Sequence, residues 1–596
     1  ANSLPTPTYE KLDRVLASVE WEQKYPSVSV HAMQRAISDH TPLLVDSGEA
    51  THVANKNAFS FELGWFEKEN FLEIIAREWA KPVSGRTSIE RWQNKIRHLR
   101  QFLRGWARNE SGIYKQEKER LTQLIEALDL KAESNLLTVN EQSSKSEAEQ
   151  GLRALLREEE LKWALRAKVL KVVQGDDNTQ FFHMIVNGKH RKKKIIQLEQ
   201  DEGTIVGHEN LKAYISNYYK QLFGPPVDND MSLDELIVED IPQLRSDENE
   251  ILSATFLEKG VSETILQMKL DKAPGPDGFP ARFYQRNWAV LKDSVVAAVR
   301  LFFTTGHMPS ETNATAIVMI PKSDQPETLK DFRPISLCSV LYKIVAKCLV
   351  NRLRPLLGDI VSLNQSAFVP GRMMTDNALV AFECFHTIEH CKKQQDSFCA
   401  YKLDLSKAYD RVDWDFLRRT MQSLGFAPRW VDWVMSCVTS VSYSVKFNGT
   451  LLDSFSPTRG LRQGDPLSPF LFLFIADGLS ALMQREATQR TITPLKVCRR
   501  APGISHLLFA DDTLLFFKAE VGQAHRVKHV LEVYAKGTGQ MINPQKCSIL
   551  FSPACRQGIQ EGIRSILQVT QTAFEAKYLG LPTPDGRMSK GKLKSL

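Results

Sequence analysis

The sequence has few of the features that mark membrane, secreted or disulfide-stabilised proteins. No run of about 18 uncharged apolar residues occurs, so no membrane-spanning helix is predicted. The first residues, ANSLP, carry no basic segment followed by an apolar one, which argues against a secretory signal. None of the nine cysteines forms a C-x-x-C pair. We therefore expect an intracellular protein, nuclear or cytoplasmic, with free thiols.

The excess of positive charge is small. Lys and Arg number 77 against 70 Asp and Glu, a formal net charge of +7, which permits a nucleic-acid partner without requiring one. At 596 residues the chain exceeds one ordinary domain and can bury a large core. It has no initiator Met and stops at Leu596, so we expect a fragment of a longer polyprotein.

The densest basic segment is KHRKKK at 189–194, which follows NTQFFH at 178–183. Aromatic rings next to cations suit base stacking combined with phosphate contact. A solvated basic face explains the same run equally well, and both interpretations stay open. The candidate nucleic-acid contacts are Lys192, Lys193 and Lys194.

The strongest local signal is HLLFADDTLLFF at 506–517. Two apolar arms of strand length flank an acidic turn, which predicts a buried β-hairpin with adjacent carboxylates at its tip. Asp is also an ordinary turn residue. Two carboxylates between such apolar arms are nevertheless costly to desolvate without a positive partner, and a divalent cation is a natural one. Asp511 and Asp512 are thus candidate metal ligands.

A second acidic segment, FCAYKLDLSKAYDRVDW at 398–414, predicts a strand that ends near Asp404, followed by a turn into a helix. Asp404 at a strand end could combine with the acidic turn to hold a pair of Mg²⁺ ions, which prefer oxygen ligands. Two metal ions about 3.5–4 Å apart activate an attacking hydroxyl and stabilise a leaving group. Alone, Asp404 also suits a helix N-cap.

The third element is RGLRQGDPLSPFLF at 459–472. It predicts a basic, glycine-bearing loop leading into an apolar helix whose start is marked by two prolines. Gly464 lets backbone approach a flat substrate closely. In isolation this string is weak evidence, but its position between the two acidic motifs makes it strong.

In this order the three elements resemble reverse transcriptases, and most closely those of plant non-LTR (LINE-type) retrotransposons. ADD at 510–512 corresponds to the family's [FY]-A-D-D box, and KLD at 402–404 to its first aspartate motif. Further ordered blocks extend the resemblance over about 270–584. They are APGPDG at 273–278, IPK at 320–322, FRPISL at 332–337, NQSAFVPGR at 364–372, GQMIN at 539–543 and YLGL at 578–581.

The resemblance implies an RNA-directed DNA polymerase with two Mg²⁺ ions, for which Mn²⁺ could substitute. Its partners would be an RNA template, a DNA primer and dNTPs. Asp404 and Asp511 would bind both metal ions and Asp512 would support them. Lys546 would protonate the pyrophosphate leaving group, although an exposed lysine is more often only a solvated charge.

The resemblance also implies the nucleotide contacts. Lys322 and Arg333 would hold the triphosphate, and Tyr409 would stack under the sugar and exclude a ribose 2′-hydroxyl. Gln463 and Gly464 would pack against the incoming base. Arg462, in the same loop, is a further candidate contact to nucleic acid.

The N-terminal residues resemble the end of the exonuclease–endonuclease–phosphatase fold. LDRVLAS at 12–18 predicts a strand, and SDH at 38–40 precedes another at 42–45. In that fold an Asp–His pair activates the nucleophile, and Asp39 and His40 match it. The other acids of that family are missing from this chain, so we expect no nicking activity.

The expected fold is α/β (α+β), a right-hand polymerase palm and fingers with a ferredoxin-like palm sheet, preceded by a mainly helical region. In that region we predict two charged helices, interpreted as a solvated connector, separated by a loop at 131–150. The predicted domains are an endonuclease remnant at 1–46, a helical linker region at 47–223, an acidic linker and polymerase extension at 224–310, fingers and palm at 311–584, and a truncated thumb at 585–596.

Two alternatives to a LINE-type polymerase stay open. A group II intron-type maturase shares the palm, but the endonuclease remnant argues against it. An inactive nucleic-acid-binding relic is the other alternative, against which the uninterrupted catalytic motifs argue.

Overall fold

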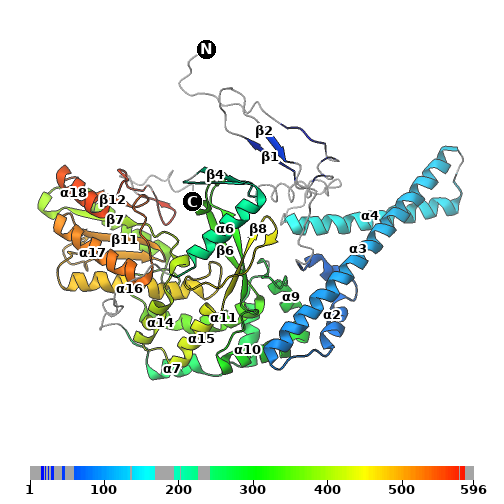
Figure 1. Ribbon diagram of the computed structural model, residues 1–596, viewed down its shortest axis with the longest axis horizontal. Coiled ribbons are helices and arrows are strands. Elements are labelled where there is room, and N and C mark those ends of the chain that lie inside the picture. The colour runs from blue at the N-terminus through cyan, green and yellow to red at the C-terminus, as the bar shows by residue number, and fades with distance from the viewer. Residues whose placement is uncertain are drawn as a thin grey trace, which may run out of the picture.

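The structure is a computed structural model (Figure 1). It describes residues 15–18, 21, 25, 28–32, 43–46, 59–134, 137–167, 194–201, 203–225, 242–270, 272–575 and 577–583. Among the helices in these ranges, none combines the length and apolar character needed to cross a membrane.

Two four-stranded sheets organise the part of the chain after residue 310. The first, here called the carboxylate sheet, has the order β10-β11-β7-β12 with antiparallel neighbours throughout. The second sheet has the order β6-β5-β8-β9, in which only β5 and β8 are parallel. The strands of the carboxylate sheet are β7 (Phe398–Leu403), β10 (His506–Phe509), β11 (Asp512–Lys518) and β12 (Ser548–Phe551). Those of the second are β5 (Ala314–Pro321), β6 (Phe332–Cys338), β8 (Ser442–Phe447) and β9 (Thr450–Leu451).

The carboxylate sheet is buried on both faces, which explains the unbroken apolar arms of its strands. Alternate side chains of a strand point to opposite faces. Leu515 and Phe517 of β11 therefore join the largest core cluster, while Leu514 and Phe516 join a separate cluster on the other face. The predicted hairpin at 506–517 and the strand ending near Asp404 are both confirmed.

Helices cover the two faces of the carboxylate sheet. α13 (Met374–Glu389) supplies Phe385 to one face, and α16 (Ser468–Thr488) and α17 (Val521–Thr538) cover the other. Pro469 stands in the first turn of α16, as predicted. The remaining helices after residue 240 are α7 (Ser246–Ser253), α8 (Glu258–Leu266), α9 (Ala281–Arg286), α10 (Trp288–Thr305), α11 (Val340–Leu353), α12 (Leu357–Ile360), α14 (Trp414–Ser423), α15 (Pro428–Thr439) and α18 (Gln557–Leu567).

The N-terminal helices are not merely a solvated connector. α2 (Phe71–Ala80) and the first half of α3 (Ser88–Ser134) place Trp79, Trp92 and Leu99 in the same core cluster as the buried face of α10. The charged residues of these helices occupy the outward face, so composition averaged over the helix hides its apolar stripe. This half of α3 is thus part of the main body, since it shares the largest core cluster.

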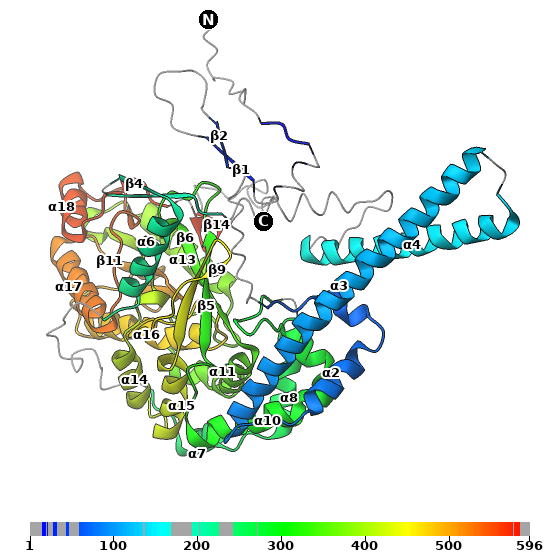
Figure 2. The same ribbon diagram turned by 45° about the vertical axis from the view of Figure 1, so that its right-hand side comes forward.

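The distal half of α3 and α4 (Val139–Ala167) form an arm that extends away from that body (Figures 1 and 2). The predicted loop at 131–150 is wrong for most of its length. Thr138 and Glu141 form a reciprocal cap at the start of α4, with Thr138 N–H donating to Glu141 over 2.9 Å. Ser, Glu and Gln here are solvated helix positions, which composition alone did not distinguish from a loop.

A further N-terminal helix covers the second sheet. α6 (His208–Leu222) follows the hairpin of β3 (Gln197–Gln200) and β4 (Gly203–Val206). Its buried side chains pack with Ile317 and Val445 of the sheet. Within the predicted acidic linker and polymerase extension at 224–310, residues 226–241 lie outside the described residues, and α7 begins after them at Ser246.

In the N-terminal segment β1 (Ser29–Ala32) pairs with β2 (Leu43–Asp46), which confirms the second predicted strand. The described residues 15–18 of the first predicted strand are not in a strand. Asp39, His40, Lys192 and Lys193 lie outside the described residues. A short hairpin, β13 (Lys577–Tyr578) and β14 (Leu581–Pro582), closes the described chain.

We expect a leucine-to-alanine substitution to change the free energy of unfolding by different amounts in the two halves of α3. Leu99 is fully buried, so Leu99→Ala is expected to lower the free energy of unfolding by about 2–5 kcal/mol. Leu130, 67% exposed on the arm, is the matched control, and Leu130→Ala should cost about 0.5 kcal/mol or less. Urea denaturation of the full chain measures both, and equal losses would contradict the assignment of the first half to the core.

Candidate active site

A single cavity of about 1400 Å³ collects most of the residues singled out in the sequence. The cavity is lined by residues of the segment after β7, the loop before α16, the acidic turn, the β5–β6 hairpin and the segment before β12. The predicted site residues on its wall are Lys322, Arg333, Asp404, Tyr409, Arg462, Gln463, Gly464, Asp511 and Lys546. Tertiary structure thus brings together candidates that span more than 200 positions of sequence.

Asp404 is held at the end of β7 by continued backbone pairing. Leu405 bridges to Ile542, and Asn543 N–H donates to the Asp404 carbonyl oxygen over 2.9 Å. The Asp404 N–H donates to Cys547 Sγ at 3.4 Å. Residues 541–543 therefore extend the sheet edge and fix the backbone that carries the Asp404 carboxyl.

The acidic turn is tight. Phe509 pairs with Asp512, which leaves only Ala510 and Asp511 in the turn. Ala510 has φ +57°, a left-handed conformation that costs an L-residue about 1–2 kcal/mol. Asp511 lines the cavity, whereas Asp512 opens β11 and lies outside the set of described residues that line it.

Burial has the largest effect on the pKa of each of the three carboxyls. Burial is the largest cause raising the pKa of Asp404, and the neighbouring Asp511 raises it further, while Lys546 and a hydrogen bond from Asn543 lower it. Burial likewise raises the pKa of Asp511 and of Asp512. A bound cation would reverse these shifts, because it favours the ionised carboxylates.

Within the described residues, no group of three or more His, Cys, Asp or Glu side chains has the arrangement of a complete metal site. Asp404 and Asp511 nevertheless line one cavity, and Asp511 raises the pKa of Asp404. Mg²⁺ is commonly held by one or two carboxylates together with substrate phosphates and water. The donor set fits a site that substrate completes.

Positive side chains line another part of the cavity. Lys322 donates through Nζ to the Lys330 carbonyl over 2.6 Å, and burial together with Lys546 and Arg333 lowers the pKa of Lys322. Sequence reasoning missed further cations on this wall, because an isolated lysine or arginine is usually a solvated charge. They are Lys330, Lys407, Arg411 and Arg459.

Tyr409 and Gln463 are both fixed by neighbours. The Tyr409 ring stacks on Phe472 of α16, with 4.6 Å between ring centroids. Gln463 Nε2 donates to Asp410 Oδ1 over 2.9 Å, and the Gln463 carbonyl accepts from Ser336 N–H over 2.8 Å. Asp410 is fully enclosed, and burial raises its pKa to about 6.

Gly464 occupies a conformation that few other residues adopt. Its φ is +99°, and a Cβ built there would lie 3.3 Å from the Ser336 carbonyl oxygen. A side chain would therefore both strain the backbone and press on β6. The loop therefore needs glycine here because of its own backbone and β6, and the predicted approach to a flat substrate stays a prediction.

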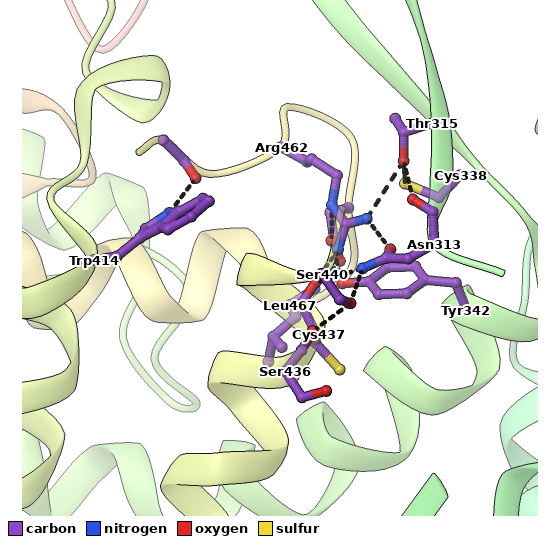
Figure 3. Close-up of polar contacts among 12 residues, drawn as sticks. Asn313, Thr315, Cys338, Tyr342, Trp414, Ser436, Cys437, Ser440, Arg462 and Leu467 are labelled. Carbon is purple, nitrogen blue, oxygen red and sulfur yellow. Dashed lines mark hydrogen bonds and ion pairs between the residues drawn. The ribbon is translucent and has the colours of Figure 1, made fainter. Parts of the chain in front are cut away.

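Arg462 corrects the sequence interpretation. Its guanidinium points into the protein, where it stacks over the Tyr342 ring at 3.8 Å and donates to the Cys437 carbonyl over 2.8 Å and to Asn313 Oδ1 (Figure 3). Nε lies 2.9 Å from Asp465 Oδ2. With only 4% of the residue exposed, these contacts occupy the side chain and exclude the predicted contact to nucleic acid.

The Arg462 partners also satisfy each other. Tyr342 O–H donates to Asp465 Oδ2 over 2.6 Å, and Asp465 Oδ1 accepts from Leu467 N–H over 2.9 Å. A buried ion pair is stable only when its remaining polar atoms are bonded in this way. The network therefore ties the loop before α16 to α11 and α15.

Among the remaining candidates, the described Lys194 is half-buried and is not one of the cavity-lining residues. Lys192, Lys193, Asp39 and His40 belong to segments outside the described residues. Their predicted roles stay predictions.

Comparisons with known proteins identify a family that this part of the chain is similar to. Residues 320–583 match the family model described as reverse transcriptase (RNA-dependent DNA polymerase). The chain contains a reverse transcriptase domain. The match spans every cavity-lining candidate from Lys322 to Lys546, and also the β13–β14 hairpin.

Relatives extend the similarity beyond this domain. The Transposon TX1 uncharacterized 149 kDa protein of Xenopus laevis is 26% identical over 88% of this chain and 40% of its own length. The Pol polyprotein from the type-2 retrotransposable element R2DM of Drosophila melanogaster is 27% identical over 47% of this chain and 25% of its own. The RNA-directed DNA polymerase from the mobile element jockey, also of Drosophila melanogaster, is 25% identical over 55% of this chain and 35% of its own length. This chain thus spans less than half the length of each.

One wall of the cavity comes from outside the matched domain. Tyr218, Gln221 and Leu222 of α6 line the cavity, and Arg459 Nε donates to the Leu222 carbonyl over 3.0 Å. Sequence reasoning assigned this segment to a helical linker. The amphipathic pattern of α6 was available, but nothing in the pattern says which surface the helix covers.

The Arg462 network predicts a stability effect. Arg462→Met leaves the buried Asp465 carboxylate without its cation and should lower the free energy of unfolding by about 3–5 kcal/mol. Arg418→Met is the matched control, since Arg418 and Asp432 form an exposed pair worth about 0.5 kcal/mol. Denaturant titration measures both variants.

The Arg462→Met variant also distinguishes a buried structural role of Arg462 from a contact with nucleic acid. Adding Asp465→Asn to Arg462→Met should recover part of the lost stability, and the salt dependence of RNA affinity should stay unchanged. A stable Arg462→Met protein with a flatter salt dependence would restore the phosphate-contact interpretation.

Proposed function

We propose that this chain is an RNA-directed DNA polymerase of a non-LTR retrotransposon, which extends a DNA primer along an RNA template with dNTPs. The observation that carries the proposal is the composition of one cavity. Two carboxylates, Asp404 and Asp511, share it with cations that suit a triphosphate and with the ring of Tyr409. The match to the reverse transcriptase family supports the same reaction.

We propose that Asp404 and Asp511 hold two Mg²⁺ ions, with Mn²⁺ as a substitute, and that Asp512 supports them through the charge of the turn. When bound, such ions activate the primer 3′-hydroxyl and stabilise the leaving pyrophosphate. The raised pKa of each carboxyl supports a cation site, because unpaired carboxylates in a desolvated cluster otherwise take up protons.

The cations complete the proposal for the nucleotide. Lys322 and Arg333 suit the triphosphate, since charge-assisted hydrogen bonds to phosphate are among the stronger ones. Lys546 lies near enough to Asp404 to affect its pKa, which supports a role for its ammonium as a proton donor for the pyrophosphate leaving group. Gln463 and Gly464 would form the surface under the new base pair.

In this proposal the carboxylate sheet is the palm, of ferredoxin-like topology, and the β5–β6 hairpin belongs to the fingers. The β13–β14 hairpin would contact the primer, and Tyr578 ties it to α13, which covers one face of the palm sheet, by donating to Asn377 Oδ1 over 2.8 Å. The plant source and the nuclear or cytoplasmic location stay predictions from the sequence.

Primer extension on an RNA template with dNTPs and Mg²⁺ tests the reaction. Asp511→Asn keeps the turn geometry but removes the negative charge, so the extension rate should fall by about 10²–10³-fold or more while RNA affinity is retained. Asp432→Asn, at an exposed surface pair, is the control. Full activity of the Asp511→Asn protein would refute the two-metal assignment.

Sugar selection tests the role of Tyr409. Stacking on Phe472 fixes the ring, so Tyr409→Ala should open space for a 2′-hydroxyl and reduce discrimination against ribonucleotides by about 10–100-fold. Tyr409→Phe keeps the ring and should keep the discrimination. The ratio of kcat/KM for dNTP and rNTP measures the effect, and an unchanged ratio in Tyr409→Ala would rule out the steric role.

A further inference from the structure

The acidic turn depends on a side chain from a distant loop. Gln365 follows α12 by a few residues and is completely buried. Its Oε1 accepts two backbone hydrogen bonds, from Ala367 N–H over 2.9 Å and from Ala510 N–H over 3.0 Å. The second bond is made to the strained residue that precedes Asp511.

The backbone around Gln365 holds this contact in register. Leu508 N–H donates to the Asn364 carbonyl over 2.8 Å, and Ser366 N–H donates back to the Leu508 carbonyl over 3.0 Å. Gln365 thereby forms a parallel bridge with Leu508 of β10. The loop acts as a short additional strand along the outer edge of the carboxylate sheet.

The loop is itself anchored on its other side. Arg372 donates to the Gln365 carbonyl over 2.7 Å, and Asn364 Nδ2 donates to the His506 carbonyl over 2.7 Å. Gln365 therefore cannot relax away from the turn without breaking several other bonds. Its Nε2 finds no hydrogen-bond partner among the described residues, so the acceptor oxygen is the part of the amide that this structure uses.

The turn needs such an acceptor. In a two-residue hairpin the N–H of the first turn residue points away from the strand ladder, and here that residue, Ala510, is 8% exposed. A buried N–H without a partner is costly, and an alanine at positive φ is already strained. The Gln365 Oε1 acceptor satisfies the buried Ala510 N–H and offsets the strain at positive φ, and it thereby selects one geometry of the turn.

We infer that Gln365 is a positioning residue for the proposed reaction, which fixes the Ala510–Asp511 turn and so places the Asp511 carboxylate opposite Asp404. Gln365 does not line the cavity among the described residues and acts through the backbone of Ala510. The expected effect on primer extension rests on the proposed polymerase function. The expected effect on the geometry of the Ala510–Asp511 turn rests on the hydrogen bonds alone.

The structural test uses the full chain in metal-free buffer. Hydrogen exchange is followed by mass spectrometry on a peptide covering residues 506–512. Gln365→Leu removes the acceptor at similar volume, and exchange at the turn should accelerate by about tenfold. Gln365→Asn, which shortens the side chain and retains its polarity, should accelerate it as well and provides the test if the leucine variant does not fold.

The matched control is Gln523→Leu. Gln523 is also buried, and its Oε1 also accepts two backbone bonds, from Thr493 N–H over 3.0 Å and Lys518 N–H over 3.2 Å. It stands at the opposite end of β11 from the acidic turn. Its variant should lose comparable stability and leave exchange at residues 506–512 unchanged.

The kinetic arm uses primer extension. Gln365→Leu should lower kcat by about 10–100-fold and raise the Mg²⁺ concentration for half-maximal rate, with little change in the KM for dNTP or in RNA affinity. Ala510→Gly removes the steric cost of the positive φ, so in that background Gln365→Leu should cost less.

The outcomes separate the inference from the proposed function. If the unmodified chain fails to extend a primer, the proposed function fails and hydrogen exchange still decides the structural role of Gln365. Unchanged exchange at the turn in Gln365→Leu overturns the inference, as does an equal effect of Gln523→Leu on exchange or Mg²⁺ dependence.

Discussion

The antiparallel register between β7 and β11 is the constraint on which the site depends. Leu403 pairs with Thr513, so the residue after β7 and the first residue of β11 come to the same end of the sheet. Asp404 and the acidic turn are thereby neighbours although a hundred residues separate them. A shift of one residue would turn every side chain of the strand to the opposite face. The two apolar clusters on the faces of the sheet exclude that shift.

At the Arg462 network, neighbouring groups compensate charge that is buried in the core. Arg462 and Asp465 neutralise each other inside the core, and Tyr342, Asn313 and Cys437 complete their hydrogen bonds. For the cavity carboxyls Asp404 and Asp511 burial is the largest influence, and it raises the pKa of both. In the low dielectric of the interior, the paired charges of Arg462 and Asp465 form a structural anchor. The carboxyls of Asp404 and Asp511, in a similar environment, form a place suited to an added cation.

The N-terminal region contributes more to this body than a connector would. The first half of α3 lies in the main core, and α6 forms part of the cavity wall. The arm formed by the rest of α3 and α4 extends away from the body (Figure 2). Segments on either side of the matched domain boundary therefore share one core, because a helix with an apolar stripe packs wherever a complementary surface exists.

The sequence by itself determined the local elements that carry chemistry. Apolar arms around ADD predicted the hairpin, and the strand before Asp404 and the proline-marked helix after the glycine loop were predictable for the same reason. Each depends on neighbours in sequence: strand periodicity, turn residues and the fixed φ of proline. Tertiary structure decided the rest. It turned Arg462 inward, placed Gln365 against Ala510 and brought α6 to the cavity, since burial and hydrogen-bond partners depend on residues far away in the chain. It also made helices of residues predicted as a loop, because a polar surface is common to both.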